Sequence, residues 1–107
     1  MDLARNIYEA TEGFPNSETF GLRMQLRRSA VNVATHVAEG HGRLTDPENR
    51  KSLSVARGSL NELETQLELA ASLRFLKAET AHQLLELATE VAKLINGLIG
   101  VLDQEPR

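Results

Sequence analysis

Hydrophobic residues recur along most of this chain at intervals of three and four positions, which is the spacing of one face of an α-helix. A short stripe comes first and three long stripes follow. The stripes are Leu3, Ile7 and Ala10; Leu22, Leu26, Ala30, Val33 and Val37; Leu53, Ala56, Leu60, Leu63, Leu67 and Ala70; and Leu84, Ala88, Val91, Ile95, Leu98 and Leu102. The pattern therefore predicts one short helix and three helices of roughly 25 residues, each about 38 Å long.

Three breaks separate the predicted helices. They lie at residues 13–18, 40–48 and 73–79. After the first break, Asn16 or Ser17 can cap the next helix by accepting a hydrogen bond from its free N–H groups. After the second break, Asp46 suits the N-cap and Pro47 the first helical position, where a missing N–H costs nothing. The third break contains neither glycine nor proline and is inferred from a change in the phase of the hydrophobic positions.

Connections this short favour neighbours that run antiparallel, so the expected fold is all-α, an up-down-up-down four-helix bundle with a short first helix. Residues 1–107 form one predicted domain, and a hydrophobic content of 41% is enough for a core. The absence of cysteine excludes disulfides and thiolate metal sites. No apolar run approaches the ~20 residues of a membrane span, and the first residues lack a signal-peptide pattern. We therefore expect a cytoplasmic protein without a membrane partner.

The last predicted helix carries more hydrophobic residues than the core of a four-helix bundle requires. Outside its stripe it also has Leu85, Leu94, Ile99 and Val101. Exposed apolar surface of this extent is typical of contact sites, so we expect these residues to lie in the interface of a homo-oligomer. The alternative is that they fold into a gap left by the short first helix.

Charge is distributed unevenly along the chain. Between Arg23 and Arg57 basic residues outnumber acidic ones, and from Gly58 onward acidic residues outnumber basic ones, although the net charge is −3. A basic stretch on an acidic chain is a candidate phosphate-binding face.

Ion pairs between neighbouring helices are expected to neutralise part of this basic stretch. In an antiparallel register centred near residue 45, the expected pairs are Arg27 and Arg28 with Glu62 and Glu64, Arg23 with Glu68, and Lys51 with Glu39. Arg43, Arg50 and Arg57 are left without a partner in this register. The candidate nucleic-acid-binding residues are therefore Arg43, Arg50 and Arg57, together with Lys51.

Small residues inside the predicted helices indicate close packing. Ala34, Ala38 and Gly58 lie where larger side chains would fill more space. Glycine in a helix interior costs about 1 kcal/mol relative to alanine. Gly58 therefore predicts a close approach between two helices.

The histidines raise the possibility of metal chemistry. His36 and Glu39 lie three residues apart on one predicted helix, with His41 just beyond. A bundle di-metal site needs a Glu-x-x-His pair from each of two helices and a carboxylate from each of two more. One pair is present here, in reversed order, so we expect no cofactor and no enzymatic activity. A small metalloenzyme that uses His36 and Glu39 is the alternative.

Several segments, in this order along the chain, resemble one protein family. They are Ile7-Tyr8, Phe14-Pro15, Gln25–Val31, Ala38–Gly40, Gly42-Arg43 and Ala56–Leu60. From about residue 7 to residue 100 the chain is similar to the bacterial 23S rRNA intervening-sequence proteins, also called S23-type proteins. The resemblance implies a four-helix bundle that assembles as a cyclic homopentamer and has no established enzymatic activity.

The resemblance also implies motif residues and partners. The motif positions, to which we assign structural roles, are Arg27, Arg28, Glu39, Gly40 and Arg43. The family often has glycine where this chain has Arg74. A related branch partners a reverse transcriptase. We therefore expect a non-enzymatic oligomeric interaction protein whose partners are copies of itself and RNA, DNA or a reverse-transcriptase-like protein.

Overall fold

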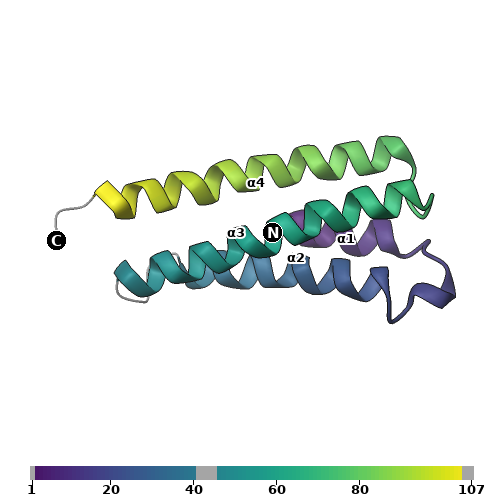
Figure 1. Ribbon diagram of the computed structural model, residues 1–107, viewed down its shortest axis with the longest axis horizontal. Coiled ribbons are helices and arrows are strands. Elements are labelled where there is room, and N and C mark those ends of the chain that lie inside the picture. Colours follow the sequence, from purple (N-terminus) through teal and green to yellow (C-terminus); the bar gives the residue numbers. More distant parts are fainter. Residues whose placement is uncertain (1, 41–45, 105–107) are drawn as a thin grey trace.

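The computed structural model describes residues 2–40 and 46–104, without the side chains of Asp46 and Gln104. These residues form four α-helices, one 3₁₀ helix and no strand (Figure 1). The elements are α1 (Asp2–Thr11), η1 (Asn16–Glu18), α2 (Leu22–Glu39), α3 (Asp46–Ser72) and α4 (Ala78–Gln104). The prediction of an all-α fold with four helices, the first of them short, is confirmed. None of the helices in the described ranges is long and apolar enough to cross a membrane.

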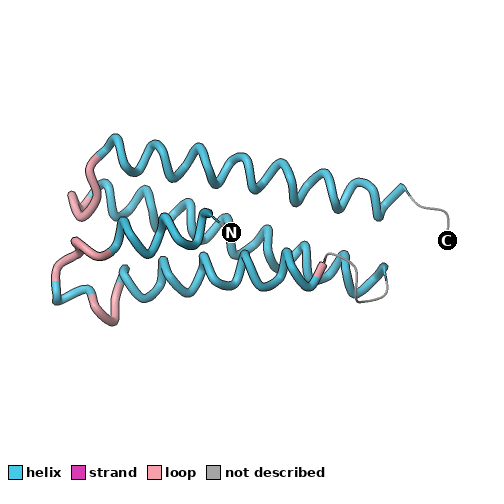
Figure 2. The backbone as a smooth tube through the Cα atoms, turned by 180° about the vertical axis from the view of Figure 1, so that it is seen from behind, coloured by secondary structure: helices cyan, strands magenta, loops and turns pink. Residues whose placement is uncertain are grey.

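The helices pack in the order of the chain and close into a ring of neighbours. α2 packs on α3 and α3 on α4, while α1 packs on both α2 and α4. Arg50 contacts Asp103 and Arg57 contacts Asn96, so α3 and α4 run in opposite directions. α1 lies alongside only one half of the long helices (Figure 1, Figure 2). The molecule therefore has a four-helix half, which contains α1, and a three-helix half, which does not.

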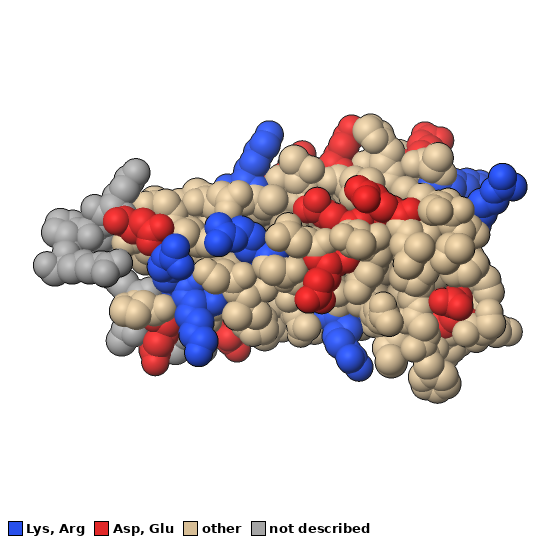
Figure 3. Space-filling view, in the orientation of Figure 1, with Lys and Arg blue, Asp and Glu red and all other residues tan. Residues whose placement is uncertain are grey.

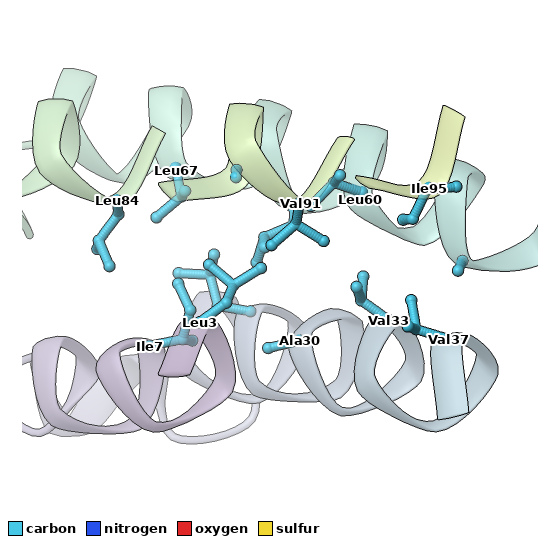
Figure 4. Packing of buried hydrophobic residues seen from close by; sticks show 14 of the residues in the cluster. Leu3, Ile7, Ala30, Val33, Val37, Leu60, Leu67, Leu84, Val91 and Ile95 are labelled. Atoms are coloured by element: carbon cyan, nitrogen blue, oxygen red, sulfur yellow. The ribbon is translucent and has the colours of Figure 1, made fainter. Parts of the chain in front are cut away.

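The predicted stripes meet in one core. Its fully buried large side chains include Leu3, Ile7, Leu26, Leu53, Leu60, Leu63, Leu67 and Ile95. The side chains of Leu3 and Ile7 point into the same core as those of Ala30 and Val91 (Figure 4). At the end of α4 the buried stripe departs from the prediction, because Ile99 is only 5% exposed whereas Leu98 and Leu102 are partly buried. The assignment of Ile99 to an intermolecular interface is therefore wrong, since it fills the core of its own chain.

The first break ends differently from the prediction. α1 ends at Thr11, and the N–H of Leu22 at the start of α2 donates a hydrogen bond to Oε1 of Glu18 at 3.0 Å. This carboxylate satisfies one of the free N–H groups of the helix and adds negative charge at the positive end of its dipole. The predicted cap by Asn16 or Ser17 is therefore wrong, because η1 brings Glu18 to that position instead.

The third break is closed by a Schellman motif. The N–H of Phe75 donates to the carbonyl oxygen of Ala70 at 2.9 Å, and that of Arg74 to Ala71 at 3.0 Å. Arg74 has a φ of 65°, the left-handed conformation that this motif requires after the last helical turn. Glycine adopts this conformation without steric cost. The motif explains why α3 stops at Ser72 without a glycine or a proline.

α2 and α3 approach each other closely next to the second break. A Cβ atom on Gly40 would lie 2.7 Å from Cγ of the buried Leu53, so only glycine fits there. At Gly58, by contrast, an added Cβ would meet nothing within 4 Å. The predicted close approach at Gly58 is therefore wrong, because this residue is on the exposed side of α3. α3 begins at Asp46, one residue before Pro47, the predicted first helical position, while the side chain proposed as its N-cap is outside the described part.

Candidate functional site

A groove runs over the outer side of α2 beside α1. It has a volume of about 470 Å³. Of the eight described residues that line it, three are the arginines Arg23, Arg27 and Arg28, and none is acidic. Tyr8 of α1 and Met24 and Val31 of α2 supply its apolar surface. We call it the arginine groove.

Arg23 is held by the carboxyl end of α1. Its Nε donates to the carbonyl oxygen of Thr11 at 3.1 Å, and its Nη2 to that of Phe14 at 2.7 Å. The carbonyl oxygen of Thr11, the last residue of α1, also accepts from the N–H of Phe14 at 3.2 Å, and that of Phe14 lies beyond the helix, so Arg23 fixes the chain that leaves α1. Because the acceptors are neutral and no described acidic side chain forms an ion pair with Arg23, its positive charge is not cancelled.

Arg27 ties α2 to the last turn of α1. Its Nε donates to Oγ1 of Thr11 at 2.8 Å, and its Nη2 to the carbonyl oxygen of Tyr8 at 3.1 Å. The same Nη2 forms an ion pair with Glu12 at 3.2 Å. Its guanidinium carbon lies 4.6 Å from the centroid of the Tyr8 ring, a cation–π contact. Thr11 is buried, and its hydroxyl also donates to the carbonyl oxygen of Ile7 at 2.8 Å.

Arg28 is exposed and makes no hydrogen bond or ion pair with the described residues. The predicted pairing of Arg27 and Arg28 with acidic residues of α3 is therefore wrong. Two structural facts explain it. Arg27 lies on the side of α2 that meets α1, and Ser29 donates to Oε1 of Gln66 at 3.0 Å, which places α2 further along α3 than the predicted register. The predicted pairs of Arg23 and of Lys51 are likewise not formed.

The other predicted basic cluster lies near the start of α3. Arg50 is not unpaired, as had been predicted, because its Nε donates to Oδ1 of Asp103 at 2.7 Å. The hydrogen bond to this carboxylate, and then its charge, raise the pKa of Arg50 above its ordinary value. Arg57 is exposed and donates to Oδ1 of Asn96 at 3.3 Å. Lys51 is exposed, and Arg43 lies outside the described residues.

Charges of both signs lie on the face seen in Figure 3. Acidic side chains gather over the middle of the molecule, while basic side chains, with some acidic ones among them, lie at the end where α3 begins, and further basic side chains lie at the opposite end (Figure 3). The acidic side chains that are exposed on α3 and α4 include Glu62, Glu68, Glu79, Glu86 and Glu90. Parts of the surface are therefore basic, although the chain has a net negative charge.

The predicted interface residues of α4 differ in exposure. Leu94 is 50% exposed and Val101 is 56% exposed, whereas Leu85 packs partly against the core. Thr80 lines a hollow between α1 and α4, and Leu94 and Val101 follow it at multiples of seven residues, on the same side of α4. Both side chains therefore lie on the α1 side of α4, beyond the reach of the short α1.

The histidines do not come together in the part of the chain that is described. Nδ1 of His36 donates to the carbonyl oxygen of Asn32 at 2.8 Å, and Glu39 is exposed. His82 contacts Glu86 one turn further along α4, with 2.7 Å between Nε2 and Oε1. In residues 2–40 and 46–104 no three His, Asp or Glu side chains are grouped to hold a metal ion. His41 lies outside these ranges.

The arginine groove and the exposed side chains of Leu94 and Val101 on α4 are the candidate binding surfaces of this helical bundle. The chain is thus a four-helix protein whose candidate site is an interaction surface. Residues 1–97 match the family model of the 23S rRNA-intervening sequence protein, and the chain belongs to this family. The resemblance inferred from the sequence motifs is therefore confirmed. The function of the family is unknown, and its members are not known as enzymes. The comparison with curated proteins found no match.

Proposed function

We propose that this chain is a non-enzymatic interaction protein that associates with copies of itself and binds nucleic acid. The arginine groove carries this proposal. Arg23 and Arg28 supply positive charge there that no described acidic side chain pairs with. The planar guanidinium group matches the geometry of a phosphate oxygen pair. A surface of this kind suits the repeated phosphates of a nucleic-acid backbone.

A binding titration with RNA and with DNA at two salt concentrations tests the nucleic-acid proposal. Counterion release predicts an affinity that falls steeply as salt rises. Arg28→Glu should weaken binding strongly without unfolding the protein, because this side chain is exposed and unpaired. Lys77→Glu makes the same change of charge at an exposed position outside both the groove and the start of α3, and is the matched control. Absence of binding by the wild-type chain at low salt would remove the proposal.

The basic residues near the start of α3 form a secondary surface in this proposal. Lys51 and Arg57 are exposed, and Arg43 precedes them in the chain. Arg50 contributes less, because Asp103 already neutralises its charge. A reverse-transcriptase-like protein, the other partner expected from the resemblance, is tested by capture on the immobilised wild-type chain.

Self-association is supported by the exposed side chains of α4. Leu94 and Val101 lie where a full-length first helix would cover them, and burying them against a second copy removes apolar surface from water. The expected assembly is cyclic, and the resemblance implies five copies. Light scattering should then give about five times the chain mass of 11.8 kDa.

Substitution of the exposed stripe tests this interface. Leu94→Asp and Val101→Asp should reduce the mass to that of one chain while the helix content stays the same, because a buried unpaired carboxylate costs several kcal/mol. Thr89→Asp, on an exposed position of the same helix, is the control. A wild-type chain that is monomeric at micromolar concentration contradicts the proposal.

A further inference from the structure

We infer that the arginine groove binds single-stranded nucleic acid, with unpaired bases against Tyr8, Met24 and Val31 and phosphates on Arg23 and Arg28. The inference rests on the proposed function and specifies its ligand. It starts from the fact that the groove is not only positively charged. Tyr8 is 42% exposed, Met24 36% and Val31 43%, and all three line the same hollow as the arginines.

These apolar side chains distinguish a single strand from a duplex. A duplex presents phosphates and sugars on its outside and keeps the faces of its bases stacked, so it offers nothing apolar to Tyr8 or Met24. A single strand exposes its base faces, which stack on aromatic rings and on guanidinium planes. The mixture of charge and apolar surface therefore matches unpaired nucleotides better than a double helix.

The aromatic ring and two of the three guanidinium groups of the groove are already fixed in place. Arg27 lies over the Tyr8 ring and is held by Thr11, and Arg23 is held by two carbonyl oxygens of the α1 end. Their side-chain entropy is thus lost on folding and not on binding, which favours affinity. Arg28 remains free to follow the position of a phosphate.

The size of the groove sets the length of strand that it takes. Its volume of about 470 Å³ is within the range of pockets that bind small ligands, roughly 300–1,000 Å³. α1 has 10 residues and is about 15 Å long. The groove therefore holds a short stretch of one strand.

Tyr8 offers a direct probe of this site. It is the single tyrosine of a chain without tryptophan, so the intrinsic fluorescence of the protein reports on the groove. A short oligouridylate should quench this fluorescence on binding, because a base stacks on the ring. An RNA duplex of the same length should quench little and bind at least about tenfold more weakly, since stacking contributes about 1–3 kcal/mol per base.

A substitution at Tyr8 separates stacking from charge. Tyr8→Leu keeps an apolar side chain but removes the ring, and should weaken binding of labelled oligouridylate at least about fivefold, measured by anisotropy. Tyr8→Phe should bind as the wild type does. Duplex affinity should be the same in both variants. Circular dichroism with equal helix content for all three proteins shows that the fold is intact.

Each contrary outcome has a distinct meaning. If the wild-type chain binds neither single strand nor duplex, the proposed function fails together with this inference. If it binds, and Arg28→Glu weakens binding, but the duplex binds equally well or Tyr8→Leu has no effect, the proposed function stands and this inference is overturned. Polyglutamate of equal charge that binds as tightly as oligouridylate also overturns it, because the groove then recognises charge alone.

Discussion

The two halves of the bundle are held together by different kinds of contact. In the four-helix half, arginines of α2 reach across to carbonyl and hydroxyl groups at the end of α1. In the three-helix half, α2 and α3 approach closely where Gly40 meets Leu53. Polar links there are at the surface, between Arg50 and Asp103 and between Arg57 and Asn96.

The length of the helices explains this difference. α1 has 10 residues and buries just two large apolar side chains, Leu3 and Ile7, so hydrophobic contact alone holds it weakly. Hydrogen bonds from Arg23 and Arg27 supply stability that the small apolar face of α1 does not provide. The long helices bury many leucines and do not depend on such bonds. An arginine should therefore matter much more for stability in the four-helix half than in the three-helix half.

Arg27→Ala should have the largest effect on stability. It removes two hydrogen bonds to α1 and the ion pair with Glu12, and it leaves the buried Thr11 with one partner fewer. We expect a loss of about 3 kcal/mol in the free energy of unfolding, measured by urea denaturation. Arg27→Lys keeps the charge without the planar fork and should recover only part of the loss. Equal stability of Arg27→Ala and wild type would remove the distinction between the two halves.

Gly40→Ala should have the next largest effect on stability, and this residue lies in the three-helix half. The added methyl group collides with Cγ of Leu53, which is fully buried and cannot move aside. Overpacking of this kind costs about 2 kcal/mol. The same denaturation measurement checks it, and a variant as stable as the wild type would mean that α2 and α3 can separate at this point without cost.

Gly58→Ala should change stability in the opposite direction. This glycine is inside α3 with open space around its Cα, so alanine adds helix propensity without a collision. We expect a gain of about 1 kcal/mol. Gly40→Ala and Gly58→Ala make the same chemical change, the first at a crowded position and the second at an open one. A loss of stability at Gly58 would contradict the open space around its Cα.

Arg50→Ala should have the smallest effect. The ion pair with Asp103 is at the surface, and both side chains are about half exposed to solvent. Water and salt screen such pairs, and ordering two long side chains opposes their attraction. The thermal midpoint should move far less than in Arg27→Ala. A shift as large as that of Arg27→Ala would show that the three-helix half also depends on polar anchors.

Helix positions could be predicted because their hydrophobic spacing is local. The stripes through Leu26, Leu60 and Ile95 are buried as expected. The contacts between helices could not be predicted, because they depend on relative rotation and register. Thus Arg27 turned toward α1 and away from α3. The same holds for the site, because the sequence predicts an ion pair for Arg28, whereas this side chain is exposed.

Two glycines and two hydrophobic residues show that the sequence alone does not reveal what surrounds a residue in the fold. Gly40 and Gly58 look alike in the sequence, yet one faces a buried leucine and the other faces solvent. The sequence predicts the same role for Ile99 and Val101, but the twist of the helix places them on different sides of α4, one buried and one exposed. Which hydrophobic residues of α4 are covered depends on how α1 and α3 pack against it.

The short first helix also has a consequence in time. Segments with few buried contacts open most readily, so the backbone amides of α1 should exchange with solvent deuterium sooner than those of α3. Tyr8 belongs to α1 and Arg28 to α2. A ligand that binds to both residues therefore binds only while α1 is packed on α2. Binding then slows the opening of α1 in proportion to occupancy. Arg23 and Arg27 anchor α1 beside the groove. The rate of amide exchange in α1 should therefore report whether a strand is bound.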